Sequence, residues 1–274
     1  MGFSSIMVGI DFDPSNNAPL RVASHLATQF DAKLIGVAAA DLPWSFYAQE
    51  APTLAVVDQL GADLAKGLAD AERRFRSAAT QPAPQIEWRS ARATPTDYIA
   101  HQARAADLII VGARRDGGLP DQFMGQIDPG DLVMRAGRPV IVVPPEAEYL
   151  DLKCAVIAWK DTREARRAVI DSLPLIQKAK DVIIAEVIED ESQREGAHGR
   201  LHDVVRWLGR HGIAAAARVF DFPEGEDPVG KLWDYGADIV VAGGYGHSRL
   251  REWIFGGFTD SFLKRSARCV FLAH

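Results

Sequence analysis

The chain has 274 residues, of which 47% are apolar and 25% charged, and its formal net charge is −6 at pH 7. These values are typical of a soluble globular protein. The negative net charge argues against nucleic acid as the main partner, because phosphate backbones are bound by clustered Lys and Arg. No apolar run reaches the roughly 18 residues of a membrane-spanning helix, so no membrane partner is expected.

The first predicted element is a buried strand in the opening stretch "MGFSSIMVGIDFD". This stretch has no basic region and acquires an acidic residue by Asp11, which favours a strand over a secretory signal peptide. Cys154 and Cys269 both lie in apolar runs, where they are expected as small core residues. We therefore expect a cytoplasmic protein without a disulfide framework.

The predicted elements then repeat along the chain. Residues 5–39 comprise an apolar strand, a polar break, an amphipathic helix and a second apolar strand, and residues 154–188 follow the same plan. In this alignment Gly9 corresponds to Ala158. The later stretch "AADLIIVGARR" is matched by "GADIVVAGGYG", and each half closes with a helix and a last apolar strand. Such self-similarity indicates two copies of one structural unit.

The join between the copies is predicted in the Pro- and acid-rich stretch 144–153, which has the composition of a linker. We therefore predict two tandem domains, residues 1–147 and 148–274. Their strand candidates are short, continuous apolar runs, as in parallel strands buried on both faces. Alternation of these strands with helical segments predicts right-handed crossovers and an α/β fold, a doubly wound sheet in each domain.

The first domain is the longer one, and its extra residues are predicted to lie at 41–60, after its second strand. A loop there belongs to the carboxyl edge of the sheet, where ligands bind in such folds. This insertion is either a surface or packing element, or a lid or interdomain contact anchored by Trp44, Phe46 and Tyr47.

Glycines cluster in the stretch "GGYGHSRLREWIFGGFTD", residues 243–260. Glycine lets backbone N–H groups approach a ligand, and a helix start after Gly257 would attract a phosphate. On spacing alone, the stretch is either a plain turn or a phosphate-binding loop. G-x-x-x-x-G-K-[ST] is absent, as is G-x-G-x-x-G after the first strand of either domain. Their absence argues against a P-loop enzyme and a dinucleotide oxidoreductase.

The spacing Gly243-x2-Gly246-x9-Gly256, before a segment ending in "CVFLAH", resembles the ATP-binding loop G-x2-G-x9-G-[S/T] of the universal stress protein family. "MVGIDFDPSN" and "VIAWKDTREA" resemble its first strand and loop, so the whole chain resembles a tandem member. The resemblance implies a flavodoxin-like, five-stranded parallel sheet of order 3-2-1-4-5 in each domain, with nucleotide across its carboxyl edge. It also implies that the two domains pair like subunits of single-domain members, while a further homodimer stays open.

Carried over residue by residue, the resemblance implies a nucleotide site in the second domain. Its three loop glycines would hold ribose and phosphates. Gly257 replaces the usual Ser or Thr, and Lys160 the usual acidic residue, for which Asp161 is the candidate substitute. The implied ligand is ATP or another adenine nucleotide, with Mg²⁺ as its candidate counterion. The other implied contacts are Ala158, Trp159, Val187, His247, Ser248, Phe258 and Thr259.

The first domain departs from the family pattern elsewhere. Asp11 keeps the acidic position and Val37 matches an adenine-contacting position. Its loop starts at Gly112, but Arg115 replaces the middle glycine and Gln126 the hydroxyl residue. A side chain in place of the glycine would occupy the phosphate channel or offer a positive charge there. We therefore expect a degenerate first site.

No organised catalytic set is visible. His198 and His202 could share a helix face as metal ligands, but a solvated face is favoured because no third ligand is close in sequence. Glu186 and Glu189 are candidate acid–base residues without an evident partner. We expect a protein that is not an enzyme, or at most a slow ATPase assisted by His247.

Three classes of function compete. The first is a stress protein that senses adenine nucleotide through its second domain, and the second is a nucleotide-independent structural or interaction protein with vestigial sites. The third is an adenylyl-transferring synthetase, which is disfavoured because the chain lacks S-G-G-x-D-S and H-I-G-H.

Overall fold

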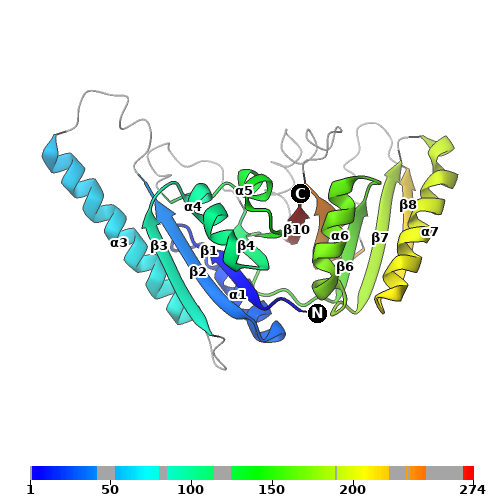
Figure 1. Cartoon of the computed structure of the whole chain (residues 1–274), viewed down its shortest axis with the longest axis horizontal. Helices are drawn as coiled ribbons and strands as arrows, with labels where there is room; N and C mark the ends of the chain where they lie inside the picture. The colour runs from blue at the N-terminus through cyan, green and yellow to red at the C-terminus, as the bar shows by residue number, and fades with distance from the viewer. Residues whose placement is uncertain are drawn as a thin grey trace. The chain divides into compact units, whose positions relative to one another are not determined.

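The chain divides into two compact units, Phe3–Tyr149 and Leu150–His274, close to the join predicted at residue 147. None of the helices in the described ranges is both long enough and apolar enough to cross a bilayer. The computed structural model (Figure 1) describes residues 2–41, 53–79, 85–113, 125–188, 190–221, 233, 235–244 and 268–274.

The first unit is built on a parallel sheet of order β3-β2-β1-β4-β5. Central strand β1 pairs Gly9 with Val37 of β2 and Met7 with Ile109 of β4. The continuous apolar runs of the sequence are the buried central strands, as the pattern predicted. The strands are β1 (Ser5–Gly9), β2 (Lys33–Ala40), β3 (Ile86–Arg92), β4 (Leu108–Gly112) and β5 (Val140–Val143).

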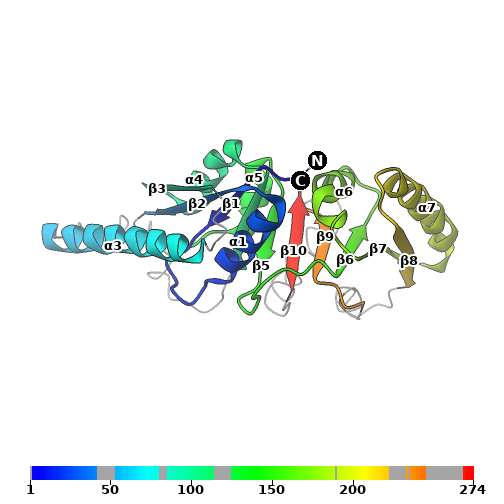
Figure 2. The ribbon, with the colours of Figure 1, turned by 90° about the horizontal axis from the view of Figure 1, so that it is seen from below.

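Helices cover both faces of this sheet. Figure 2 shows α1 and α3 on one face and α4 and α5 on the other, the arrangement that right-handed crossovers produce. In α1, Leu20, Ala23 and Ala27 follow one another at helical spacing and are all buried. The helices are α1 (Ala18–Phe30), α3 (Leu54–Ala78), α4 (Pro95–Gln102), the 3₁₀ turn η1 (Ala103–Ala105) and α5 (Pro129–Ala136).

The predicted insertion at 41–60 is described only at its ends. Residues 42–52, including Trp44, Phe46 and Tyr47, lie outside the described residues. Its last residues form the first turns of α3, which has 25 residues, whereas the corresponding helix α7 of the second unit has 17. Part of the extra length of the first domain therefore extends a helix.

The second unit repeats the plan, with strand order β10-β9-β6-β7-β8. The matching order in both units confirms the predicted tandem, doubly wound α/β fold. Its elements are β6 (Cys154–Trp159), α6 (Arg163–Ile176), β7 (Asp181–Ile188), the 3₁₀ turn η3 (Glu191–Gln193), α7 (Arg194–Arg210), β8 (Ala215–Asp221), β9 (Ile239–Gly243) and β10 (Cys269–Ala273).

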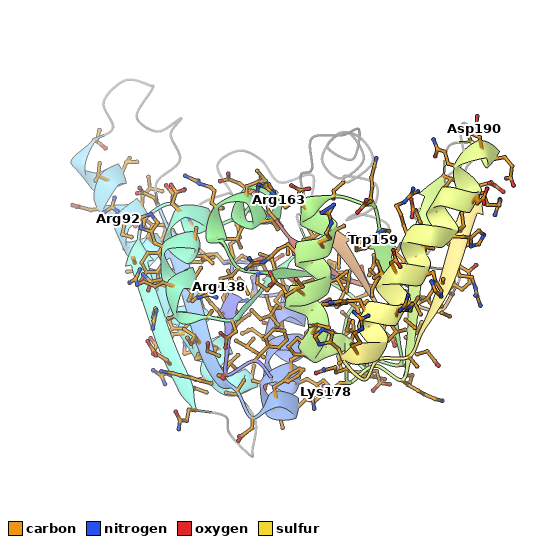
Figure 3. The ribbon with its side chains drawn as sticks, turned by 45° about the vertical axis from the view of Figure 1, so that its right-hand side comes forward. Arg92, Arg138, Trp159, Arg163, Lys178 and Asp190 are labelled. Atoms are coloured by element: carbon orange, nitrogen blue, oxygen red, sulfur yellow. The ribbon has the colours of Figure 1, made fainter. Side chains whose placement is uncertain are left out.

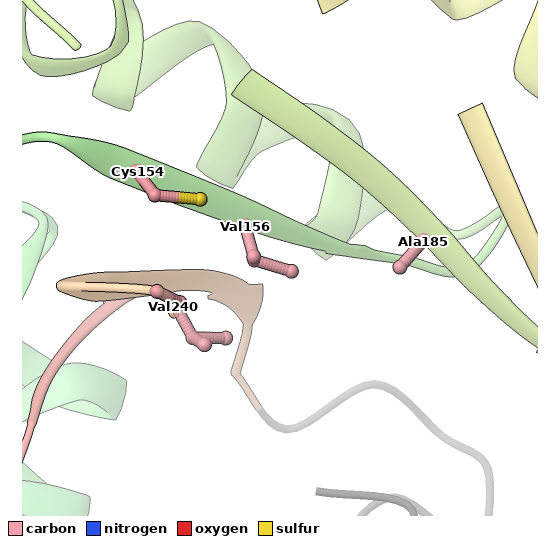
Figure 4. Packing of buried hydrophobic residues seen from close by; sticks show 5 residues of the cluster. Cys154, Val156, Ala185 and Val240 are labelled. Atoms are coloured by element: carbon pink, nitrogen blue, oxygen red, sulfur yellow. The ribbon is translucent and has the colours of Figure 1, made fainter. Parts of the chain in front are cut away.

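A cluster of buried residues lies on one face of this second sheet. Cys154 and Val156 of β6 pack with Ala185 of β7 and Val240 of β9 (Figure 4). Both cysteines are buried and free, which confirms them as core residues, and burial raises the pKa of the Cys269 thiol to about 12. Because side chains alternate along a strand, Trp159 of β6 points to the opposite face, where α6 and α7 pack.

Candidate functional site

The carboxyl ends of β6 and β9 carry the described part of the predicted site in the second unit. Ala158, near the end of β6, pairs with Ala185 of β7 and Ala242 of β9. After β6 the chain turns through Lys160 and Asp161, both exposed, into α6. The structure therefore brings the predicted β6 and β9 residues to the same edge of the sheet.

Gly243, the first glycine of the predicted loop, lies against the first turn of α6. A Cβ atom at this position would stand 2.5 Å from the amide nitrogen of Ala165 and 2.6 Å from the carbonyl carbon of Glu164. No side chain fits there unless backbone moves. Close packing of strand and helix thus accounts for this glycine, a reason the sequence alone did not reveal.

Gly244 continues the strand ladder at the same edge. The Gly244 N–H donates to the carbonyl oxygen of Ala273 at 2.7 Å, and Nδ1 of His274 lies 3.0 Å from the carbonyl oxygen of Gly244. The start of the loop is therefore held by the last strand. The other predicted loop residues lie outside the described residues, namely Gly246, His247, Ser248, Gly256, Gly257, Phe258 and Thr259.

The helix that begins beside Gly243 has its own cap. The hydroxyl of Thr162 accepts a hydrogen bond from the Ala165 N–H at 3.3 Å. Asp161 pairs with Arg166 of the first turn at 3.1 Å. The structure thus joins Asp161, the proposed substitute for the family's acidic residue, to α6 by an ion pair.

Glu186 of β7 has a partner that the sequence did not indicate. It is buried, and Nε of Arg200 in α7 lies 3.0 Å from its Oε1 and 3.3 Å from its Oε2. Hydrogen bonding to Glu186 raises the pKa of Arg200. The carboxylate is thus held in an ion pair, while Glu189 lies outside the described residues.

Val37, which matches an adenine-contacting position of the family, and Val187, the implied contact at the end of β7, occupy different registers. Val37 stands opposite Gly9, whereas the aligned Ala158 stands opposite Ala185, and Val187 follows two positions later. Val37 is fully buried, so it offers no surface to a ligand in this structure. Val187 is half-buried.

The carboxyl edge of the first unit is filled by its own side chains. A Cβ at Gly112 would stand 2.6 Å from Nδ2 of Asn16. Asn16 is buried and donates from that nitrogen to Oδ2 of Asp11 at 2.6 Å. Arg74 of α3 donates to the carbonyl oxygens of Asp11 and Asp13. The predicted acidic residue and loop glycine do meet at this edge, with Asn16 between them.

Phe12 occupies a second part of this edge. A Cβ on Gly67 of α3 would stand 2.6 Å from Cδ2 of the ring, and one on Gly125 would stand 2.8 Å from Cγ. The Phe12 ring therefore packs against Gly67 of the helix α3 and Gly125 of the predicted loop. The only sequence signal for this packing was a glycine inside a helical pattern. Arg115 lies outside the described residues.

Burial raises the pKa of the Asp11 carboxyl above its ordinary value of 3.8, while the Asn16 hydrogen bond and the Arg74 charge lower it. This group contributes stability that is fully present below pH 3.8 and is lost as pH rises through the raised pKa. We expect Asn16→Ala to raise the pKa of Asp11 further, because it removes a donor to the carboxylate. The ¹³C shift of this carboxyl against pH measures it.

The control for that titration is Ser15→Ala, which removes a donor to Asp13 and none to Asp11. It should leave the pKa of Asp11 close to that of the wild type. A lower Asp11 pKa in Asn16→Ala than in the wild type would contradict the assigned role of Asn16.

The two candidate metal ligands on α7, His198 and His202, are both exposed. Within the described ranges, no group of three or more His, Cys, Asp or Glu residues could hold a metal ion.

The model of the universal stress protein family matches residues 2–144. A universal stress protein from Archaeoglobus fulgidus is similar over 98% of this chain and 96% of its own, with 15% identity and a TM-score of 0.71. A functionally unknown protein from Pseudomonas aeruginosa is similar over 99% and 92%, with 15% identity and a TM-score of 0.58. At these identities the likeness concerns the fold. No curated protein matches the chain.

Proposed function

Because this chain belongs to the universal stress protein family, we propose that it binds an adenine nucleotide at the carboxyl edge of its second unit. In this proposal ATP, ADP or AMP is a signal that the protein senses in a stress response, and the protein is not an enzyme. Cytoplasmic location and pairing of the two domains stay predictions, and a further homodimer stays open.

The difference between the two carboxyl edges carries the proposal. In the first unit, Asn16 lies against Gly112 and Phe12 against Gly125, so side chains fill the space beside both glycines. Counting from the aligned Gly9 and Ala158, the position of Phe12 corresponds to Asp161, which is exposed and paired with Arg166. No aromatic ring follows β6 at this position.

The sequences of the two predicted phosphate loops also favour the second unit as the nucleotide site. The second unit keeps Gly243, Gly246 and Gly256, whereas the first has Arg115 where the second has Gly246. Backbone N–H groups of such a loop can surround phosphate oxygens. Lys160 adds an exposed positive charge at the same edge. Mg²⁺ would accompany the phosphates of ATP and neutralise part of their charge.

The test gives the second loop a residue that the first loop carries at the aligned position. Gly246→Arg gives the second loop the side chain that the first carries at Arg115, and we expect it to abolish ATP binding by filling the phosphate channel. For the wild type, ATP at 100 times its Kd should stabilise the second unit by about 2.7 kcal/mol. Isothermal titration calorimetry and thermal denaturation, each with and without ATP–Mg²⁺, measure both effects.

Gly199→Ala is the matched control, because Gly199 lies in α7 and nothing stands within 4 Å of a Cβ built on it. It should bind ATP like the wild type. If millimolar ATP, ADP and AMP all fail to bind the wild type, the protein is the nucleotide-independent interaction protein instead. Unchanged ATP binding by Gly246→Arg would remove the loop from the site.

A further inference from the structure

Glu164 carries a carboxylate that folding removes from water at the carboxyl edge of the second unit. It is the second residue of α6, and only 6% of it is exposed. A Cβ built on Gly243 would stand 2.9 Å from the Cβ of Glu164. Glutamate is almost never buried unless it is paired. A buried carboxylate beside the first glycine of a predicted phosphate loop is therefore unusual.

The side chain of Glu164 lies at the N-terminal end of α6. Side chains of a helix lean toward its N-terminus, and this carboxylate is hydrogen-bonded to the side chain of Thr162, the residue that caps the helix. Figure 3 shows the neighbouring Arg163 at the same end of α6. The carboxylate therefore lies where β9 ends and the predicted phosphate loop begins.

Glu164 is ionised at neutral pH. Burial raises the pKa of its carboxyl, but hydrogen bonds from its own backbone N–H and from Thr162, together with Arg163, lower the pKa more strongly, to below its ordinary value of 4.5. Among the described residues its ion-pair partner is Arg163, whose Nη2 lies 3.1 Å from Oε1 of Glu164. The Arg163 side chain is 77% exposed, so solvent weakens this pairing.

The other charged residues between β6 and the first turn of α6 are in contact with solvent. Lys160, Asp161, Arg163 and Arg166 are all exposed, whereas Glu164 is buried. Water and salt screen exposed charges, and they screen buried charges much less. A phosphate at this edge is therefore subject to the charge of Glu164 with less screening than to its neighbours.

The first unit has no carboxylate at the corresponding position. Counting from the aligned Gly9 and Ala158, the position of Glu164 corresponds to Ser15, which is neutral and exposed. The buried charge thus belongs to the unit that keeps the glycine spacing of a nucleotide loop.

We propose that Glu164 sets the selectivity of the second unit among adenine nucleotides, by lowering the affinity for free ATP more than the affinity for AMP. This inference rests on the proposed nucleotide site and narrows the choice among its ligands. ATP carries more phosphate charge than AMP, so one carboxylate repels it more strongly. Mg²⁺ on the phosphates neutralises part of that charge, and MgATP is therefore repelled less than free ATP.

The test is isothermal titration calorimetry of AMP and of ATP, both in EDTA, with the wild type and with Glu164→Gln. Glutamine keeps the length of the side chain and an acceptor for the Thr162 hydroxyl, but it removes the charge. We expect the Kd of ATP divided by the Kd of AMP to fall about tenfold in the variant. Partial unfolding would weaken the binding of both nucleotides alike and cancels in this ratio.

Excess Mg²⁺ in place of EDTA should remove most of this effect, because MgATP carries about the same charge as AMP. Glu195→Gln is the matched control and should keep the ratio of the wild type, since Glu195 is an exposed acidic residue in the first turn of α7. If both nucleotides bind and Glu164→Gln leaves the ratio unchanged, the selectivity proposal is wrong and the nucleotide site stands. If the wild type binds neither nucleotide, the proposed function fails and this inference fails with it.

Discussion

Gly243→Ala is expected to destabilise the second unit by about 3 kcal/mol, at the upper end of the usual penalty for overpacking. The added methyl would stand 2.5 Å from the amide nitrogen of Ala165 and 2.6 Å from the carbonyl carbon of Glu164. A flexible side chain could move away, but these atoms belong to the first turn of α6. The strand β9 and the helix must therefore separate, which also disturbs the Thr162 cap. Urea denaturation of the variant and the wild type measures the loss.

Gly199→Ala is the control for this stability measurement too. Gly199 lies inside α7, and nothing stands within 4 Å of a Cβ built on it. Alanine there should stabilise the protein by about 0.5–1 kcal/mol, because glycine is the poorer helix former. If Gly243→Ala were as stable as the wild type, the close packing of β9 on α6 would be wrong.

The packing of Gly243 also decides which mutation can report on the nucleotide. Loss of ATP binding in Gly243→Ala would follow from a displaced strand end as readily as from a lost phosphate contact. Gly246 follows the end of β9 by three residues, and the first loop carries Arg115 at the aligned position. Gly246→Arg is therefore the sharper test of function, and Gly243→Ala the sharper test of fold.

Most of the fold could be predicted because the chain repeats and its strands are continuous apolar runs. Continuous apolar runs do not, however, reveal the register in which neighbouring strands pair. Where both faces of a strand are buried, polar and apolar residues do not alternate along it. The sequence pattern is then the same for a pairing that is shifted by one or two residues. Val37 and Val187 were therefore matched to one role, although the residue in the register of Val37 is Ala185.

The contacts of the sites were harder to predict, because they join residues far apart in the chain. Phe12 packs against Gly67 and Gly125, and nothing local to any of the three indicates the other two. Trp159 was implied as a nucleotide contact by the family resemblance, and this stays a prediction. Strand alternation directs its ring to the face of the sheet on which α6 and α7 pack, where Trp207 also lies.

The close contact between Gly36 and Phe75 in the first unit allows a test with two destabilising substitutions that partly compensate each other. Phe75 of α3 is fully buried and lies flat against Gly36 of β2, where an added Cβ would stand 2.6 Å from Cδ2 of the ring. Gly36→Ala should cost about 1–3 kcal/mol by overpacking. Phe75→Ala should cost about 3–5 kcal/mol through the cavity it leaves.

The double variant Gly36→Ala/Phe75→Ala should be less destabilised than the sum of the two single variants, by about 1–3 kcal/mol. The clash disappears with the ring, and the new methyl fills part of the vacated space. Urea denaturation of all four proteins gives this coupling. If Phe75→Ala is too unstable to measure, Phe75→Leu keeps the same sign with a smaller amplitude.

Gly61 provides the matched control for the cycle. It lies in the same helix as Phe75, and nothing stands within 4 Å of a Cβ built on it. Gly61→Ala should therefore combine with Phe75→Ala additively, within about 0.5 kcal/mol. Additivity for Gly36 as well would mean that the ring does not lie on this glycine. A coupling confined to Gly36 would confirm that α3 packs on β2 through the contact of Phe75 with Gly36. The same position of α3 brings Gly67 against Phe12 at the carboxyl edge of the first unit.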